Sequence, residues 1–194
     1  EKTDDPQISP QKREALLANP LLTAHPILFV ARPQYRADHH NTATMFVTGE
    51  INTASFRGGG ALKTIDLAHG GKITTLLEAP EGIIRDPEVH FDGSRILFAM
   101  RRNIKDDYHS VFGPIPPCAL RPLTFAKGVA DIDPLYLPDG DIIFTSTREP
   151  KYCMCNRHIM GNLFRMTADG ANIYQIGKNT LHEGHSALLP DGRI

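Results

Sequence analysis

The sequence contains no tryptophan, only three cysteines and almost no net charge. Three cysteines are too few for a small domain that is held together by disulfides. The formal net charge of −1 gives no electrostatic footprint for nucleic acid or for an anionic membrane surface. Because no apolar run approaches the roughly 18 residues of a membrane-spanning helix, we expect a globular chain with no nucleic-acid partner and no membrane insertion.

Several catalytic signatures are also missing from the sequence. It has no G-x-S-x-G nucleophile elbow, no H-E-x-x-H zinc motif and no phosphate-binding glycine loop. The triplet Gly58-Gly59-Gly60 precedes a predicted strand rather than a helix, so it lacks the helix dipole that holds phosphate. The absence of C-x-x-C-H excludes covalent attachment of a c-type haem within these residues.

A repeated motif is the strongest signal that the chain does contain. Three segments share one pattern that ends in Asp-Gly, namely Asp86–Gly93, Asp133–Gly140 and Ser186–Gly192. The Asp-Gly pairs begin at residues 92, 139 and 191, so they lie 47 and 52 residues apart. Asp-Gly is typical of two-residue hairpin turns, in which φ is positive. A repeat of this length indicates the blade of a β-propeller.

Apolar runs follow the Asp-Gly pairs. Arg95–Met100 and Ile142–Thr147 are short and rich in Ile and Phe, and Arg193-Ile194 begins a third run. Runs of this kind between turns predict strands that are buried on both faces, which is the environment inside a propeller blade. With strands lettered A to D from the inside outward, we expect B, C and D strands of a first unit at Ile27–Ala31, Ala61–Leu67 and Ile73–Leu77. Complete units are expected from Asp86 to about Ala126 and from Asp131 to about Gly177, with outer strands of the last one at Asn162–Thr167 and Asn172–Ile176 and a further unit starting near His185.

The predicted fold is therefore all-β: an incomplete β-propeller of about three four-stranded blades over residues 25–194, open and truncated at its C-terminal end. A sandwich of unrelated hairpins is the alternative, but it gives no reason for the constant phase of the Asp-Gly pairs. Residues 1–24 are predicted to be a separate extension with a short helix at Gln11–Ala18, because Ser9-Pro10 can start a helix and Asn19-Pro20 can end one. Four prolines between Ser110 and Pro122 predict an irregular outer half in the middle blade.

Strand alternation predicts where chemistry can occur. The tight A–B and C–D turns share one end of the sheets, so the longer B–C and D–A connections share the other end. These connections carry imidazole, carboxylate and thiolate groups, which are ligands of zinc and of several transition metals. The candidate metal ligands are Asp38, His39, His40, His182 and His185, and the candidate cofactor-binding residues are Cys153, Cys155 and His158.

Each candidate also has a plainer interpretation. The run Asp38-His39-His40 can cap turns in a polar loop, and C-x-C-x-x-H is not a zinc-finger spacing, so the cysteines can be small buried apolar residues. His182 and His185 are three residues apart, but they lie in a predicted loop, where helical geometry does not apply. His90 alternates with apolar neighbours in a predicted strand and is interpreted as a structural histidine.

At these residues the sequence resembles the propeller region of the hydrazine synthase alpha subunit and related planctomycete TolB-like propeller proteins. The Asp-Gly repeats are general to TolB-like propellers, whereas the loop Cys-Met-Cys-Asn-Arg-His at 153–158 is much more specific. The resemblance covers most of the chain from about residue 25 onward. The stretches that carry it are Asp38–Phe46, Arg85–Gly93, Asp131–Arg148, Lys151–Arg165 and Glu183–Ser186.

The resemblance implies a larger anammox protein whose complex joins nitric oxide and ammonium into hydrazine, with c-type haems in domains beyond the propeller. It implies that Cys153 or Cys155 lies beside a haem and that His182 or His185 is among the ligands of a zinc ion. The propeller would shield that haem and zinc redox site and supply ligands to it. Its partners would be other domains of the full-length chain and other subunits, in the periplasm or an anammoxosome-like compartment.

Three functions remain open on the sequence. The chain is the noncatalytic part of a haem enzyme subunit, a TolB-like scaffold that binds proteins or ligands, or a propeller that caps a hydrolase domain. An open arc exposes two blade flanks that a closed propeller buries. We therefore expect the isolated 194 residues to be inactive and to fold poorly or aggregate.

Overall fold

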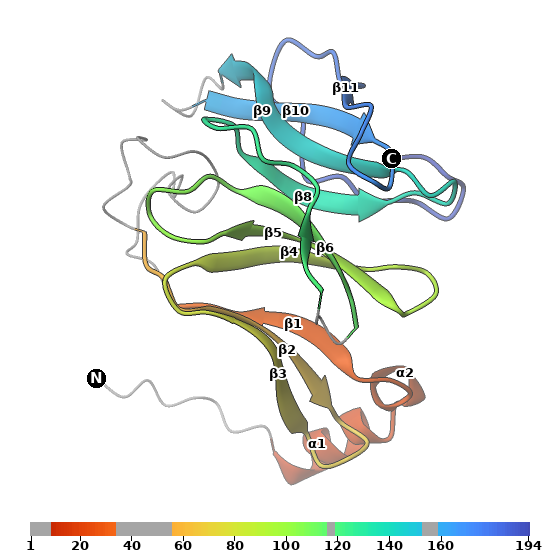
Figure 1. The fold of residues 1–194 in the computed structure, drawn as a ribbon. Helices are drawn as coiled ribbons and strands as arrows, with labels where there is room; N and C mark the ends of the chain where they lie inside the picture. Colours follow the sequence, from red (N-terminus) through yellow and green to blue (C-terminus); the bar gives the residue numbers. More distant parts are fainter. Residues whose placement is uncertain (1–8, 34–55, 116–118, 153–158) are drawn as a thin grey trace.

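Three antiparallel sheets follow one another in chain order in the computed structural model, which describes residues 9–33, 56–115, 119–152 and 159–194 (Figure 1). The first sheet has the order β1 (Ile27–Ala31), β2 (Gly60–Asp66), β3 (Lys72–Ala79). The second has the order β4 (Ile83–Val89), β5 (Arg95–Arg101), β6 (His109–Pro114), β7 (Arg121–Pro122). The third consists of β8 (Asp131–Tyr136), β9 (Ile142–Tyr152), β10 (Ile159–Met166) and β11 (Tyr174–Gln175), again neighbours in chain order.

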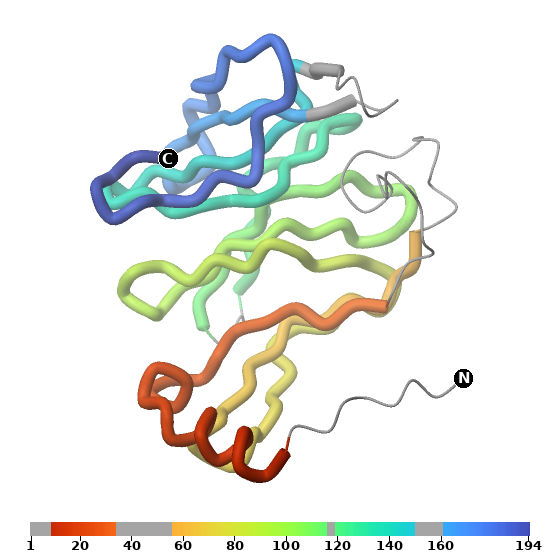
Figure 2. Tube along the Cα trace, turned by 180° about the vertical axis from the view of Figure 1, so that it is seen from behind, coloured from red at the N-terminus to blue at the C-terminus, as the bar shows by residue number. Residues whose placement is uncertain are grey.

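Each sheet is an up-and-down meander, and the sheets stack face to face. The first strand of the third sheet, β8, lies against β4, β5 and β6 of the second sheet, and β4 in turn lies against β1 and β2. Figure 2 shows the first and last sheets at opposite ends of the resulting arc. This arrangement confirms the predicted fold, an all-β open propeller with sheets of three and four strands.

The first blade enters the described structure at its second strand. Strands β1 and β9 begin with the related triplets Ile27-Leu28-Phe29 and Ile142-Ile143-Phe144, and β5 has the triplet Ile96-Leu97-Phe98 from its second residue. Strand β3 leads directly into β4, which is the innermost strand of the next blade, so β3 is a D strand and β1 is a B strand. Within the described residues, the first blade therefore has strands B, C and D, as expected from the sequence.

Apolar side chains between the sheets hold the arc together. One cluster joins the first two blades, one joins the second and third blades, and one lies near the ends of β4, β5 and β8. Their buried members are Leu62, Ala79, Ile84, Ile96, Phe98 and Val111 in the first cluster; Leu97, Leu123, Tyr136, Ile142, Phe144, Phe164 and Met166 in the second; and Ile83, Ala99, Tyr108, Ala130 and Ile132 in the third. Alternate residues of one B strand thus supply opposite flanks, because successive side chains point to opposite faces.

The hairpin turns differ in detail from the prediction. At 92, 139 and 191 only the glycine has positive φ, with values of 71°, 93° and 85°. In the third blade Leu137 N donates to Asp141 O at 2.9 Å and Gly140 N donates to Leu137 O at 3.0 Å. The expectation of two-residue turns is wrong, because these bonds enclose a three-residue loop that ends in a left-handed glycine.

The outer strands are short. In the second blade β7 has two residues, as the proline-rich sequence before it predicted. In the third blade the predicted strand over Asn172–Ile176 is reduced to β11, because Asn172 has a φ of 52° and cannot continue an extended strand.

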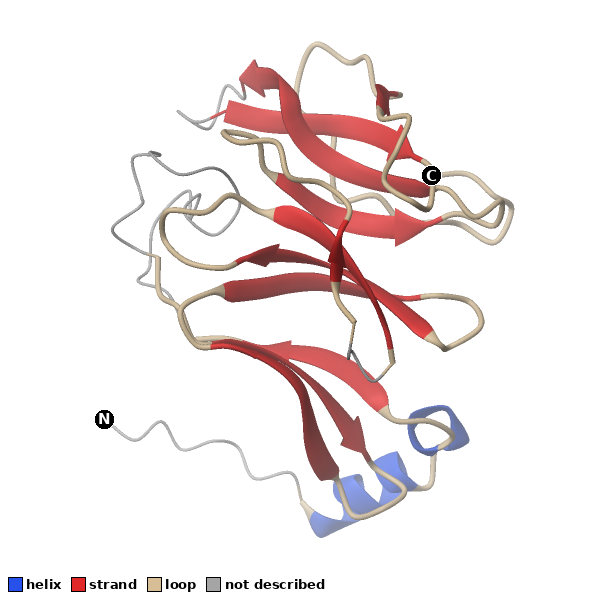
Figure 3. Ribbon diagram, viewed as in Figure 1, coloured by secondary structure: helices blue, strands red, loops and turns tan. Residues whose placement is uncertain are grey.

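Helix is confined to the N-terminal part of the described chain (Figure 3). Helix α1 (Pro10–Leu17) begins one residue before the predicted one, with Ser9 Oγ accepting a hydrogen bond from Lys12 N at 3.3 Å. The Asn19-Pro20 pair caps a further short helix, α2 (Pro20–Thr23), which was not predicted. Neither of these helices, nor any other in the described ranges, has the length and apolar character to cross a membrane.

Candidate functional site: the loop end of the blades

The B–C and D–A connections of neighbouring blades meet at one end of the sheets, which we call the loop end. The ring of Phe56, which precedes β2, lies 4.6 Å from the guanidinium of Arg101 at the end of β5. Within the second blade, Gly128 N in the D–A connection donates to Asp107 Oδ2 in the B–C connection at 2.7 Å. Thr147 N in β9 donates to Ala130 O at 3.0 Å. The prediction that these connections share one end is confirmed for the described residues.

A buried ion pair lies just beneath the loop end. Asp131 at the start of β8 is fully buried, and its Oδ2 accepts a hydrogen bond from Arg148 Nη2 at 2.8 Å. Burial raises the pKa of Asp131, although the charge of Arg148 and hydrogen bonds from Ser146 and Thr124 lower it. The cost of desolvation therefore exceeds the stabilisation of the charged form. This pair is a structural feature of the blade junction.

The D–A connection of the third blade packs on the base of its B–C connection. Strands β9 and β10 pair at Tyr152 and Ile159, which flank the loop with the predicted Cys153, Cys155 and His158. Immediately after that base, Gly161 O accepts a hydrogen bond from Glu183 N at 3.2 Å and lies 3.0 Å from His182 Nδ1. His182 therefore lies near the base of the loop that carries the cysteines.

The two described histidine candidates lie side by side. The ring centroids of His182 and His185 are 6.2 Å apart in an edge-on arrangement. Zinc binds imidazole nitrogen at about 2.0–2.1 Å, so two imidazoles on one tetrahedral zinc would have centroids about 5 Å apart. A proton on His182 Nδ1, donated to Gly161 O, leaves the Nε2 lone pair available as a ligand.

A tetrahedral zinc site needs four ligands, of which two imidazoles would supply only two. Among the residues with described positions, no group of three or more His, Cys, Asp or Glu side chains is arranged to hold a metal ion. The other candidate ligands, which are Asp38, His39, His40, Cys153, Cys155 and His158, lie outside the described residues. The described part of the chain therefore fits zinc only as a site completed by further ligands.

A series of charged side chains that sequence reasoning missed runs along the innermost strands. Arg85 Nε donates to Asp86 Oδ2 at 2.6 Å, and the same carboxylate oxygen accepts from Asp133 N in the next blade at 3.1 Å. His185 Nδ1 lies 3.7 Å from Asp133 Oδ2. The series Arg85–Asp86–Asp133–His185 thus links three successive repeat units, and we call it the inner series.

The repeated backbone geometry of the inner series was visible in the sequence as a repeated Asp-Pro pair. Asp86, Asp133 and His185 occupy equivalent positions and have φ values of 51°, 55° and 59°. At Asp86-Pro87 and Asp133-Pro134 the strand pairing shifts register, so each pair forms a β-bulge. Proline is tolerated at bulges because it has no N–H to donate to the sheet. A bulge redirects the neighbouring side chain, here toward the next blade.

Two acidic groups on the innermost strands, Asp133 and Glu88, have raised pKa values and ionise less readily than usual. Burial raises the pKa of Asp133 above its ordinary 3.8 and the Asp86 carboxylate raises it further, while His185 and Arg85 act in the opposite direction. Burial, and then the charge of Asp133, raise the pKa of Glu88. The folded state therefore holds these protons more tightly than the unfolded state does.

A pH-dependent change in stability follows for Asp133→Asn. Because the pKa of Asp133 is raised in the folded state, its protonated carboxyl contributes fully to stability at a pH below the pKa of the unfolded chain. This contribution is lost as the pH rises through the pKa of Asp133 in the folded state. Asparagine removes this loss and tolerates positive φ. The free energy of unfolding of the variant, relative to wild type, should therefore increase as pH rises above about 4, measured by urea denaturation.

Asp139→Asn is the matched control for that experiment. The Asp139 carboxyl is exposed, and a hydrogen bond from Asp141 N, followed by Arg165, holds its pKa below the ordinary value. The contribution of the Asp139 carboxylate to stability therefore increases with pH, opposite to that of Asp133. The free energy of unfolding of Asp139→Asn, relative to wild type, should fall slightly as pH rises. Parallel pH profiles for the two variants would contradict the assignment of opposite pKa shifts.

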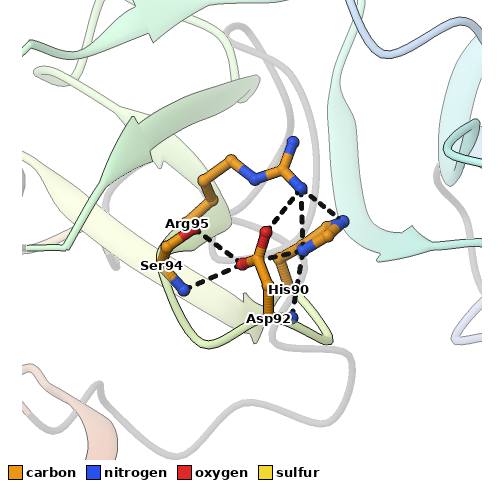
Figure 4. Close-up of polar contacts among 4 residues, drawn as sticks. All are labelled: His90, Asp92, Ser94 and Arg95. Atoms are coloured by element: carbon orange, nitrogen blue, oxygen red, sulfur yellow. Dashed lines mark hydrogen bonds and ion pairs between the residues drawn. The ribbon is translucent and has the colours of Figure 1, made fainter.

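At the opposite end of the sheets, which carries the A–B turns, polar side chains of the second blade are bonded to one another. In the second blade Arg95 Nη2 lies 2.8 Å from Asp92 Oδ2 and 2.7 Å from His90 Nε2, and Ser94 N donates to Asp92 Oδ1 at 2.9 Å (Figure 4). The His90 ring also packs edge-on against Tyr136 of the next blade, with centroids 4.7 Å apart. His90 therefore has structural partners, consistent with its interpretation from the sequence.

Comparison with known proteins gives matches among solved structures only. No known protein family and no curated protein matches the chain. TolB from Acinetobacter baumannii superposes with a TM-score of 0.54 at 17% sequence identity, covering 69% of this chain and 30% of TolB. A putative TolB from Agrobacterium tumefaciens has a TM-score of 0.47 at 17% identity, covering 67% of this chain and 47% of that one.

A puromycin hydrolase also matches, with a TM-score of 0.49 at 14% identity, covering 62% of this chain and 19% of the hydrolase. This chain thus spans less than half the length of each of these proteins. At this level of identity the likeness concerns the fold and not the activity. The chain has the fold of a TolB-like β-propeller, and its described residues form an open arc of that propeller.

Proposed function

We propose that this chain is a propeller scaffold whose loop end supplies ligands to a metal-containing redox site that is completed by another part of the protein. The observation that carries the proposal is the contact of His182 and Glu183 with Gly161 O. Through this contact, the His182 imidazole is held near the base of the loop that contains Cys153 and Cys155, and the ring centroid of His185 lies 6.2 Å from that of His182. Imidazole and thiolate together are ligands for zinc and for haem iron.

The resemblance to the hydrazine synthase alpha subunit gives the proposal its chemistry. A zinc ion would be held by His182 and His185 together with ligands from Asp38, His39 and His40, and Cys153 or Cys155, with His158 nearby, would face a haem. The haem itself would be attached in another domain, because this sequence has no C-x-x-C-H motif. When bound, the haem would supply the redox chemistry that converts nitric oxide and ammonium into hydrazine.

The part played by this chain would be ligand supply, orientation and exclusion of water. Gly161 O orients the His182 ring by accepting the Nδ1 proton, which is how outer-shell carbonyls commonly fix a metal-binding histidine. Asp133 can do the same for His185, whose Nδ1 lies 3.7 Å from its carboxylate. By the same resemblance, we place the protein in the periplasm or in an anammoxosome-like compartment, in contact with other subunits.

Zinc content tests this proposal. The purified intact protein should retain about one zinc ion per chain, since four ligands fill a structural zinc site, and the double variant His182→Ala/His185→Ala should lose most of it. Elemental analysis by mass spectrometry measures both. His69→Ala is the control, because His69 is highly exposed on a turn at the opposite end and is bonded to Asp66. Equal zinc in wild type and the double variant would end the proposal.

A second candidate function is a scaffold for a protein partner without a metal site. Large apolar side chains are exposed in three connections at the loop end, with exposed fractions of 44% for Ile104, 81% for Phe125 and 52% for Leu181. Exposed aromatic residues are common in interfaces. The zinc measurement separates the two functions, because a scaffold of this kind predicts no zinc that depends on His182 and His185.

A further inference from the structure

Three buried polar atoms at the junction of the second and third blades have no hydrogen bond. Asp131, Asn162 and Ser110 are fully buried. Within the described part of the chain, the atoms Asp131 Oδ1, Asn162 Oδ1 and Ser110 Oγ have no hydrogen-bond partner. A buried polar group without a partner costs free energy, so native interiors seldom hold several of them together. Such a group of atoms indicates a bound molecule that supplies their hydrogen bonds.

Two of these atoms belong to one row across the third sheet. Asp131 on β8 and Asn162 on β10 both pair with Ser146 on β9. Directly paired residues of a sheet place their side chains on the same face. Asp131 Oδ2 accepts a hydrogen bond from Arg148 Nη2 at 2.8 Å, and Asn162 Nδ2 donates to Glu149 O at 2.8 Å. Both side chains therefore converge on the part of β9 that follows Ser146, whose own side chain is small.

The third atom comes from the second blade and faces this row. Ser110 on β6 pairs with Ala99 on β5, and Ala99 packs in the same cluster as Ile132 of the third blade. Ser110 N donates to Thr124 Oγ1 at 3.0 Å, and Thr124 in turn interacts with the Asp131 carboxylate. Ser110 therefore lies on the face of its sheet that meets the polar row.

The free atoms define the chemistry of the bound molecule. The charge of Asp131 is balanced by that of Arg148, so the molecule is neutral. Asp131 Oδ1 and the amide oxygen of Asn162 can only accept hydrogen bonds, whereas Ser110 Oγ and the unpaired Arg148 Nε can donate them. A water molecule matches this pattern, because it donates two hydrogen bonds, and buried waters make about three in all.

We propose that an ordered water molecule is bound at this junction, donating to Asp131 Oδ1 and Asn162 Oδ1 and accepting from Ser110 Oγ. A water that bridges two atoms with hydrogen bonds of ordinary length spans about 5.5 Å between them, so the two oxygens need not touch to share it. The water joins the second blade to the third beneath the loop end, beside the base of the loop between β9 and β10. This inference does not depend on the proposed metal site.

A crystal structure of the intact protein tests the proposal. Its electron density should show a water within hydrogen-bonding distance of all three atoms. Ser110→Val should displace this water, since the added methyl groups occupy its place and offer no hydrogen bond. Ser94→Val is the control and should leave the water bound, because Ser94 lies on an exposed A–B turn. An anion or a metal ion at this position would overturn the proposal, as would hydrogen bonds that join the three atoms without a water.

Water relaxation in solution gives a second measurement. Oxygen-17 magnetic relaxation dispersion counts the water molecules that stay bound for longer than the protein takes to tumble. The count should be lower by one in Ser110→Val than in the wild type and unchanged in Ser94→Val. Equal counts in all three proteins would contradict the proposal, and the wild-type electron density decides the question if Ser110→Val does not fold.

Discussion

Phe144→Ala should lower the free energy of unfolding by about 3–5 kcal/mol. Phe144 is fully buried in β9, and its ring lies 6.1 Å from that of Phe164 between centroids. It belongs to the cluster that joins the second and third blades, which also contains Leu97 and Tyr136. Truncation removes apolar contacts from both blades and leaves a cavity where two sheets meet. Urea denaturation followed by circular dichroism measures the loss.

Phe125→Ala is the matched control for that prediction. The substitution is chemically identical, but Phe125 is 81% exposed in the second D–A connection. Its removal should change the free energy of unfolding by about 0.5 kcal/mol or less. Comparable losses from the two variants would mean that the cluster between the blades does not hold the arc together.

Asp131→Ala should lower the free energy of unfolding by about 3 kcal/mol or more, because removing one partner of a buried ion pair leaves the other charge uncompensated. Asp131 is fully buried, and the side chain of its partner Arg148 is 21% exposed. Partial access of water to Arg148 places the expected loss near the lower end for buried pairs. Urea denaturation at neutral pH gives the measurement.

Two further variants separate the ion pair from general effects of mutation. Asp139→Ala removes an exposed carboxylate bonded to Arg165, and because surface ion pairs contribute little to stability, it should lower the free energy of unfolding much less than Asp131→Ala does. The double variant Asp131→Leu/Arg148→Met removes both charges, and it should be more stable than Asp131→Ala, since apolar replacements of buried pairs are often neutral. A double variant less stable than Asp131→Ala would show that the stability lost in Asp131→Ala does not come from the uncompensated charge of Arg148.

The strand layout was predictable because blade interiors impose a strong pattern. Short apolar runs rich in Ile and Phe, two of which follow Asp-Gly pairs at a blade-sized spacing, predicted β1, β5 and β9 at their observed starts. The weakest predictions were the outer strands, where Pro122 and Asn172 shorten the pairing. Outer strands bury little apolar surface, so the sequence pattern that marks them is faint.

The turns and the inner series were not predicted, for a different reason. The Asp-Gly pair is compatible with several loop lengths, and the length is set by hydrogen bonds such as that from Leu137 N to Asp141 O. In the sequence, Asp86-Pro87 and Asp133-Pro134 stand out only as part of the repeat. Their bulges and the bond from Asp133 N to Asp86 Oδ2 depend on contact between blades, which local sequence does not encode.

The candidate site was predicted in part. Strand alternation predicted that His182 and His185 lie in a D–A connection at the loop end. In the described structure His182 lies beside Gly161, whereas His185 occupies the position of Asp133 on the innermost strand. The candidates Asp38, His39, His40, Cys153, Cys155 and His158 lie outside the described residues and stay predictions. His182 lies near the base of the cysteine loop because of contacts with the backbone of Gly161. No sequence motif predicts such contacts.

The most direct test of the account is a pair of distances between spin labels, measured by double electron–electron resonance in a cysteine-free background. Labels at Ser94 and Pro138 both lie on A–B turns of adjacent blades, whereas Lys178 lies in the D–A connection that leads to His182. A strand of six residues spans about 20 Å, so the Ser94–Lys178 distance should exceed the Ser94–Pro138 distance by more than about 10 Å. Equal or reversed distances would place the histidine connection at the turn end and contradict the shared loop end.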